Sequence, residues 1–532
     1  MFAIAFLIGV YANIIFLLGL VGLYTPIVIA ITTVCYLGFS AIFWKKFDER
    51  IEWRKIKKEL GLFWSTRKIW TLVLLIVLGI IFIGVLSPEL GFDALWYHLT
   101  LPKIFLNSHR ILFLPGGLFY YSTMPKLGEM LYLSSLAMGT DTLAHSIHAF
   151  FAVLSAIAIY CITLRFTSKK YAFLAVAIFF SNIVVLWEAT TAYIDLIRAF
   201  FEIMSVWGML FYLSTKKQKW LIESALLLGL AVETKLIALG SVIVMIIVFW
   251  IFTQDRVRQK IQRTLLYTLL AITPSLGWLV FSYVQTGNPF YPLFSVYAIH
   301  LGKDTLAFPQ VITDLVTIFL TASDPISPIY LVLLPLFFVV RRKLPKKSLP
   351  IFVAVLVSMI IWTLTPKTGG GRFLLAYLPV LSVASGIILS SLKGNTQIQR
   401  ISIVVVFICL VIAALYRGVA SLKYFPVVLG FESRQHFLAT HLNFEFGDFY
   451  DINQEIKNTV KPGTKTLLYG FHNLYYMDIP FIDSSYVRPG DKFSYILTQH
   501  TSLPKRFSYW QPIYTNPTTG ITLYTVGSPW MY

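Results

Sequence analysis

Thirteen apolar segments constrain this chain more than any other feature of its sequence. A transmembrane helix needs about 20 largely apolar residues, a length that most of these segments approach. Only 13% of the 532 residues are charged, roughly half the share found in soluble domains. We therefore predict an α-helical polytopic membrane protein with about 13 transmembrane helices. The segments are 2–21, 24–44, 69–88, 141–164, 171–188, 196–214, 220–233, 236–252, 264–284, 327–340, 349–365, 372–392 and 401–417.

The basic residues are concentrated in short runs between these segments. Cytoplasmic loops of membrane proteins are enriched in Lys and Arg, so these runs predict the orientation of the chain. Counting segments from one run to the next places every run on the same side, with the N-terminus in the cytoplasm and the C-terminus outside. The formal net charge of +19 thus indicates orientation in a cell membrane, and we predict no nucleic-acid partner. The runs are 45–68, 165–170, 216–219, 256–263 and 341–347.

The predicted outer face carries the long connections of the chain. We predict a membrane domain over 1–417, with outer loops 88–140 and 285–327, and an extracytoplasmic α/β cap domain over 418–532. Within the cap domain the pattern predicts one helix, three strands and a turn. The helix is expected at 448–460, the strands at 464–469, 493–498 and 521–526, and the turn at 516–520.

Three acidic residues lie at the outer ends of predicted spans. Asp93 follows the third span directly, where partial desolvation would suit a general base that meets a polar substrate from outside. Capping of a helix that begins near Ala94 is the alternative role. Glu188 ends the fifth span and Asp195 opens the sixth, so with Asp93 they could form facing carboxylates. Helix capping, or pairing with Arg198, would also explain them.

Two basic residues lie at the same predicted face. Lys235 separates two short spans, which could also form one broken element. Arg372 opens the twelfth span after 369–371, three glycines in succession. Because arginine at a helix start opposes the helix dipole, binding of an anion such as phosphate would explain its position. The glycines would let backbone amides approach the same anion, although the Gly-Lys-Ser/Thr ending of a nucleotide loop is absent.

Histidine spacing gives a weak metal signal. His145 and His148 are three residues apart on a predicted helix, which is compatible with a shared metal, but no third ligand follows at a fixed spacing. Packing between helices, or a position at the membrane interface, is the favoured explanation of the pair. We predict no cofactor and no metal site, a divalent metal being possible but unsupported by the sequence.

Several short stretches together resemble the GT-C superfamily, the multi-span glycosyltransferases that use lipid-linked sugars, such as the protein O-mannosyltransferases and the aminoarabinose transferase of lipid A. The acidic first outer loop, the proline-containing stretch after it, the lysine after a short span and the arginine at the start of a late span occur in the same order. One departure is that Ala94 follows Asp93, where many relatives have a second acid. The stretches are 92–98 with 101–103, 121–129, 233–235, 287–292 and 371–379.

The resemblance implies transfer of a sugar from a polyprenyl-phosphate donor to a glycan, lipid or protein acceptor on the outer face. Asp93 would be the general base, and Asp195 or Glu188 the second acid, with Asp195 orienting the reacting groups. Arg372 and Lys235 would bind the phosphate. The resemblance extends the expected substrate-binding set to Glu188, Tyr97, His98, Lys103 and Glu129.

Two other functions are compatible with the same topology. A lipid or solute transporter would place polar groups and broken helices near the middle of the bilayer and often contains an inverted repeat. The chain shows no such repeat, and its charged groups lie at the helix ends. A non-catalytic membrane scaffold with the same fold is the second alternative.

Overall fold

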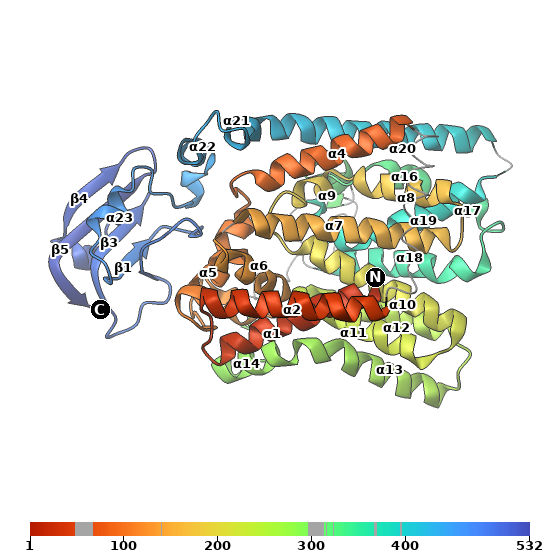
Figure 1. Ribbon diagram of the computed structural model, residues 1–532, viewed down its shortest axis with the longest axis horizontal. Helices are drawn as coiled ribbons and strands as arrows, with labels where there is room; N and C mark the ends of the chain where they lie inside the picture. Colours follow the sequence, from red (N-terminus) through yellow and green to blue (C-terminus); the bar gives the residue numbers. More distant parts are fainter. Residues whose placement is uncertain are drawn as a thin grey trace.

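The computed structural model describes residues 1–47, 68–139, 141–295, 313–314, 316–322, 324–365, 370–393 and 396–532. The basic run 45–68 and the outer loop 285–327 therefore lie partly outside the described residues. All thirteen predicted segments are helical (Figure 1). The helices are α1 (Phe2–Leu20), α2 (Pro26–Phe47), α4 (Lys68–Leu86), α7 (Asp141–Leu164), α8 (Lys169–Phe180), α9 (Ile183–Glu188), α10 (Asp195–Thr215), α11 (Gln218–Thr234), α12 (Leu239–Phe252), α13 (Val257–Ile272), α14 (Leu276–Thr286), α16 (Ile329–Leu333), α17 (Leu336–Val340), α18 (Leu349–Leu364), α19 (Leu378–Ser391) and α20 (Thr396–Ser421).

Nine helical stretches in the described part of the chain are long and apolar enough to cross a membrane, and two shorter apolar stretches accompany them. The exact number of thirteen spans is therefore not confirmed. The predicted fifth segment is divided into α8 and α9, because the side chain of Asn182 donates to the carbonyls of Ile178 and Phe179 at the break. The predicted seventh and eighth segments are separate helices, since Lys235 between them has an extended backbone (φ −157°, ψ 117°).

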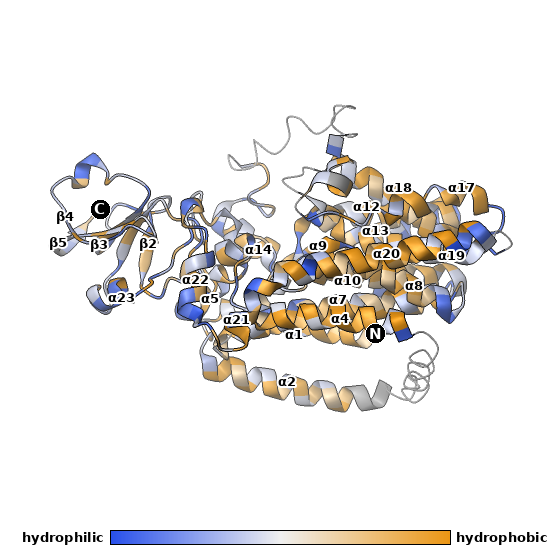
Figure 2. Cartoon of the chain, turned by 90° about the horizontal axis from the view of Figure 1, so that it is seen from above, coloured by the Kyte–Doolittle hydropathy of each residue, from blue (hydrophilic) through white to orange (hydrophobic). Residues whose placement is uncertain are grey.

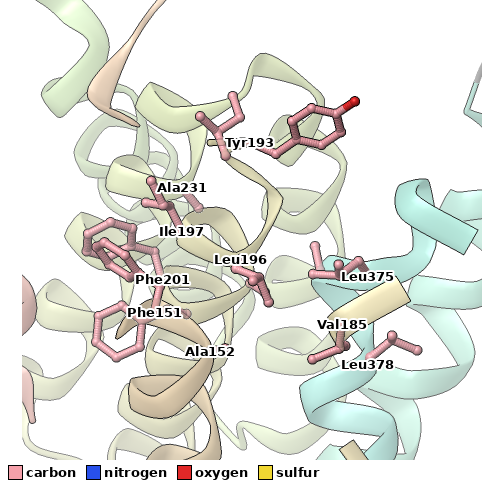
Figure 3. Packing of buried hydrophobic residues seen from close by; sticks show 14 of the residues in the cluster. Phe151, Ala152, Val185, Tyr193, Leu196, Ile197, Phe201, Ala231, Leu375 and Leu378 are labelled. Atoms are coloured by element: carbon pink, nitrogen blue, oxygen red, sulfur yellow. The ribbon is translucent and has the colours of Figure 1, made fainter. Parts of the chain in front are cut away.

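Two elements form the centre of the helix bundle. In α10, 83% of the most apolar stretch is buried, and in the segment 371–391 the share is 89%, whereas it is 6% for the peripheral α2. Figure 3 shows part of this packing, in which the buried side chains of Leu196 in α10, Val185 in α9 and two leucines of the late segment, Leu375 and Leu378, lie in the same cluster. The outer helices expose apolar side chains along their length, as contact with lipid requires. Figure 2 shows that these helices consist mainly of hydrophobic residues.

The bundle and the cap domain lie end to end. In Figure 1 the long helices run parallel to the long axis of the molecule, with the cap domain at one end and the N-terminus of α1 towards the other. The connection after α4 lies at the cap end and contains a π-helix η2 (Ala94–His98), α5 (Thr100–Asn107), a 3-10 helix η3 (Tyr120–Thr123) and α6 (Leu127–Ala137). The side of the membrane on which each terminus lies, and hence which end faces the cytoplasm, stays a prediction.

The cap domain is a mixed five-stranded sheet with short helices. The strand order is β2-β1-β3-β5-β4, in which β1 is parallel to β2 and β3, and β5 is antiparallel to β3 and β4. The strands predicted from the sequence correspond to β1, β3 and β5, whereas β2 and β4 were not predicted. The elements are α21 (Phe425–Val428), α22 (Arg434–His441), α23 (Glu455–Thr459), β1 (Thr466–Tyr469), β2 (Phe481–Asp483), β3 (Lys492–Gln499), β4 (Gln511–Asn516) and β5 (Ile521–Met531).

The predicted helix over 448–460 is wrong for most of its length, since only Glu455–Thr459 is helical. Asp448 forms an isolated bridge with Asn473, and its carboxylate accepts from the amide nitrogen of that side chain at 2.6 Å. Asp451 accepts from the backbone amides of Ile456 and Lys457 instead, which closes a turn ahead of α23. Side-chain bonds of this kind compete with a longer helix.

The cap domain contacts the connection after α4 directly. Arg434 forms an ion pair with Asp141, the first residue of α7. The hydroxyl of Tyr476 donates to the carbonyl of Glu89 at 2.8 Å. Lys103 donates to the carboxylate of Asp478 at 2.7 Å. These bonds join the cap domain to the segment that contains Asp93.

Candidate active site

Asp93 lies just before the π-helix η2, and its side chain makes no capping bond there. Its Oδ2 atom lies 2.7 Å from Nη1 of Arg372 and accepts a hydrogen bond of 3.1 Å from the hydroxyl of Tyr97. The backbone amide of Asp93 donates to the hydroxyl of Tyr193 at 3.3 Å. The carboxylate is thus oriented towards a cation from a late span, and helix capping does not explain it.

Arg372, which lies late in the membrane domain, contacts the carboxylate of Asp93. It lies in the 3-10 helix η9 (Gly371–Tyr377), which leads into α19. Its Nε atom is 3.9 Å from Oδ2 of Asp195, and its guanidinium lies 5.0 Å from the centre of the Tyr193 ring. Two carboxylates therefore compensate the positive charge that opposes the helix dipole.

Asp195 and Lys235 complete the group. Nζ of Lys235 lies 2.7 Å from Oδ1 of Asp195, and the Asp195 side chain is 3% exposed. The two residues meet because Asp195 opens α10 and Lys235 ends α11, the helix that packs beside it. Asp93, Arg372, Asp195 and Lys235 are called the charge cluster below. The alternative pairing of Asp195 with Arg198 does not occur, since Arg198 binds Glu202 one turn further along α10.

Asp324 was not predicted, yet it anchors the charge cluster. Its Oδ2 accepts from the backbone amide of Arg372 at 3.1 Å. A Cβ atom on Gly370 would clash with Oδ1 of Asp324, so only glycine permits this approach. Burial raises the pKa of Asp324, while the amides of Gly371 and Arg372 act in the opposite direction. The backbone amide of Arg372 is thus bonded to a carboxylate of the same chain, and the predicted approach of these amides to a phosphate stays a prediction.

Glu188 lies at the end of α9 and is fully buried. Neither of its carboxylate oxygens has a hydrogen-bond partner in the described part of the chain. Nε2 of His148 lies 3.9 Å from it. Glu188 therefore makes no direct contact with Asp93, and the predicted facing pair is instead Asp93 and Asp195, which Arg372 joins.

His148 fixes the turn between α9 and α10. Its Nδ1 donates to the carbonyls of Glu188 and Thr191 at 2.7 and 2.9 Å, and its Nε2 accepts from the amide of Leu196 at 3.1 Å. This pattern requires one neutral tautomer. The ring holds the first turn of α10, and hence Asp195, in place.

Glu89 is a second residue that sequence reasoning missed. One carboxylate oxygen accepts from the amide of Gly91 at 2.6 Å, and the other accepts from the amide of Ala192 at 2.7 Å. The second oxygen also lies 2.8 Å from Nε2 of His145. Glu89 thus joins the segment before Asp93 to the turn before Asp195. The two histidines predicted as possible metal ligands are engaged with protein groups, and no group of three or more His, Cys, Asp or Glu residues suited to a metal occurs among the described residues.

His98 and Glu129 form a buried pair behind the charge cluster. Nδ1 of His98 lies 2.8 Å from Oε1 of Glu129, and the His98 ring lies 5.9 Å from that of Tyr193. Burial alone would raise the pKa of Glu129, but Lys126 and His98 outweigh it and lower the pKa. His98 of this pair packs against Tyr193, whose ring in turn contacts Arg372. Lys103 does not lie in the charge cluster, because it binds Asp478 of the cap domain.

Tyr97 donates to the carboxylate of Asp93, and Tyr121 lies next to Tyr97 and accepts from the hydroxyl of Tyr120. Burial raises the pKa of Tyr97 well above its usual value, and the nearby charge of Asp93 raises it further. Burial also raises the pKa of Tyr121, whose ring lies 4.7 Å from that of Tyr97. Both hydroxyls therefore keep their protons at neutral pH.

A family model agrees with part of the chain. The model of the dolichyl-phosphate-mannose-protein mannosyltransferases matches residues 132–278. This range contains Glu188, Asp195 and Lys235 of the candidate site, but neither Asp93 nor Arg372. No curated protein matches the sequence significantly.

Solved structures agree with most of the chain. ArnT from Cupriavidus metallidurans bound to undecaprenyl phosphate matches with a TM-score of 0.58 and 12% identity, over 85% of this chain and 97% of that chain. The apo form of the same protein matches with a TM-score of 0.55 and 12% identity over the same shares. The chain is therefore a multi-pass membrane protein with the fold of the GT-C glycosyltransferases.

Proposed function

We propose that the protein transfers a sugar from a polyprenyl-phosphate donor to an acceptor at the cap end of the helix bundle. The observation that carries the proposal is the charge cluster, in which two acids and two cations from four separate segments meet at that end. The matched ArnT structure holds undecaprenyl phosphate, and the matched family is named for dolichyl-phosphate-mannose. Both carriers are polyprenyl phosphates, which supports this donor class.

Arg372 and Lys235 would bind the donor phosphate. The isoprenoid tail would lie in the bilayer beside the helices, with its phosphate at the level of the charge cluster. Arg372 and Lys235 would then neutralise the negative charge that develops as the sugar leaves. Asp195 orients both cations, because it lies 2.7 Å from Lys235 and 3.9 Å from Arg372.

Asp93 would be the general base. It would accept the proton of the acceptor hydroxyl or amine as the oxygen or nitrogen forms a bond with the anomeric carbon. The bond between the anomeric carbon and the phosphate oxygen would break, and the polyprenyl phosphate would leave with the bonding electrons. The step needs no nucleotide.

The decisive experiment is sugar transfer by the purified protein in lipid nanodiscs. Polyprenyl-phosphate hexoses and pentoses with a radiolabelled sugar would serve as donors, with membrane glycan, lipid and protein fractions as acceptors. Label that moves to an acceptor in the wild type, but not in Asp93→Asn, is the expected result. Transfer by neither protein would support the scaffold alternative, and movement of a labelled solute across sealed vesicles without any transfer would support the transporter.

The proposed outer location has its own test. Single cysteines at positions 138 and 216, both exposed and close to the two ends of the bundle, would be labelled in intact cells with a reagent that does not cross membranes, in a variant without Cys35, Cys161 and Cys409. We expect labelling at 138 and none at 216. The reverse pattern would place the charge cluster on the cytoplasmic side and contradict the proposed location.

A further inference from the structure

A group of aromatic rings lies between the charge cluster and the cap domain. The rings are partly exposed, and the ring of Phe92 is the most exposed of them at 42%. Five come from the connection after α4 and one from the cap domain. We call this group the ring wall: Phe92, Trp96, Tyr97, Tyr120, Tyr121 and His472.

The ring wall is continuous from the catalytic carboxylate to the cap domain. Tyr97 donates to Asp93, and its ring lies 4.7 Å from that of Tyr121. The Tyr121 ring lies 5.2 Å from that of Trp96. Trp96 in turn lies 4.3 Å from the imidazole of His472. A ligand on these rings would therefore be close to Asp93.

His472 is the contribution of the cap domain. Its ring stacks on Phe92 at 4.8 Å with an interplanar angle of 26°. Its Nδ1 lies 2.8 Å from Oδ1 of Asn473, whose amide nitrogen donates to Asp448 and so fixes the orientation of the amide. Nδ1 therefore carries the proton. In the tautomer that this bond selects, Nε2 is an acceptor, and it has no hydrogen-bond partner among the described residues.

We propose that the ring wall binds a sugar ring of the acceptor, and that Nε2 of His472 accepts a hydrogen bond from one of its hydroxyl groups. The acceptor would thus be a glycan, a class that the proposed transferase function leaves open and on which this inference rests. Aromatic faces offer apolar contact to the C–H groups of a sugar, and a few oriented polar groups then select its hydroxyls.

The position of the wall favours the acceptor sugar over the donor sugar. The donor phosphate is assigned to Arg372 and Lys235 at the ends of the membrane helices. His472 belongs to the cap domain, on the opposite side of Asp93 from the bundle. An acceptor that arrives from outside would meet the cap domain first and would place its hydroxyl beside Asp93.

The first test is binding without turnover. Methyl pyranosides of glucose, galactose and mannose would be added to the full-length protein in nanodiscs, and saturation-transfer NMR would detect contact with the sugar. We expect a signal for at least one glycoside, its loss in His472→Ala and its partial return in His472→Gln, which retains an acceptor. His436→Ala is the matched control, because His436 lies on α22 of the same domain and is largely exposed.

The second test separates acceptor from donor. In His472→Ala we expect the acceptor KM to rise about tenfold with the donor KM unchanged, as for one lost hydrogen bond. A change in the donor KM alone would assign the wall to the donor sugar and overturn the proposal. Transfer to peptides but to no glycan would also overturn it. If His472→Ala does not fold, Phe92→Leu provides the same comparison.

The two proposals fail separately. Transfer by the wild type together with equal glycoside signals in wild type and His472→Ala would refute the ring wall alone. Signals that depend on His472 without any sugar transfer would refute the transferase function and leave a glycan-binding protein.

Discussion

Nη1 of Arg372 lies 2.7 Å from Oδ2 of Asp93, although the two residues are far apart in the sequence of the membrane domain. The same guanidinium approaches Asp195, which binds Lys235. The proposed general base and the proposed phosphate ligands are therefore one electrostatic unit. A substitution at any of them changes the others, so the predictions below use controls with matched chemistry.

Asp93→Asn is expected to lower the rate of sugar transfer by about 10²–10⁴-fold, because the amide cannot accept the proton of the acceptor. The measurement is kcat with a labelled polyprenyl-phosphate sugar. Asp255→Asn is the control. Asp255 lies between α12 and α13 and is also paired with an arginine, Arg263 of α13. Equal losses in both variants would mean that Asp93 has only a structural role.

Arg372→Lys is expected to raise the donor KM and to lower kcat, together by about 10²-fold. Lysine keeps the charge but cannot contact Asp93 and Asp195 with separate nitrogens. Arg263→Lys provides the matched control. Retention of wild-type kinetics by Arg372→Lys would exclude a geometric role for the guanidinium.

Gly370→Ala is expected to lower the thermal stability and the activity together, because the added Cβ would clash with Oδ1 of Asp324. In the double variant with Asp324→Ala the clash is absent, so the two effects should not add. A coupling of about 0.5–3 kcal/mol is typical for residues in direct contact. Melting temperatures of the four proteins in one detergent would measure it, and simple additivity would contradict the observed contact.

Glu129→Gln is expected to destabilise the protein at neutral pH, because it leaves the buried Lys126 without its counter-charge. The pKa of Glu129 is lowered in the folded state, so its contribution is present above the pKa of an unfolded glutamate and is lost as the pH falls through the lower folded value. The gap in melting temperature between wild type and variant should therefore narrow below about pH 4. The control is Glu455→Gln, because Glu455 lies at the start of α23 and its side chain is exposed. A gap that widens in acid would contradict the assignment.

Removal of divalent metal is expected to leave sugar transfer unchanged. Arg372 and Lys235 supply two positive charges for the phosphate, and the carboxylates that could bind a metal at this point are already paired with them. The measurement is the rate after treatment with EDTA, with and without added Mg²⁺, Mn²⁺ or Zn²⁺. A rate that disappears with EDTA and returns with one metal would show that a cation takes part.

The helices could be predicted because hydropathy is a local property of the sequence. The break between α8 and α9 could not, since Asn182 is held there by Ser327 and Tyr330 from a distant part of the chain. The cap domain was predicted less well because its short strands also depend on contacts with distant parts of the chain. Its strand β2 has only three residues, and it depends on pairing with β1.

The charge cluster was accessible from the sequence because its residues lie at the ends of apolar spans on the predicted outer face, away from the basic runs, where an ionisable group bordering the hydrocarbon region indicates a functional site. Asp93, Asp195, Arg372 and Lys235 were expected to meet, and the structure brings them together. Glu89 and Asp324 were missed because their partners include backbone amides, which leave no mark in a sequence. Lys103 was expected near the substrate but lies at the contact with the cap domain, where Asp478 binds it.

The ion pair of Asp93 with Arg372 also bears on the order in which substrates bind. Nη1 of Arg372 and the hydroxyl of Tyr97 both lie against Oδ2 of Asp93. A carrier phosphate that binds Arg372 would compete with Asp93 for the guanidinium and would leave Oδ2 free to contact the acceptor. Productive binding of the acceptor would then follow that of the carrier, so that a single contact imposes an ordered kinetic mechanism on the reaction.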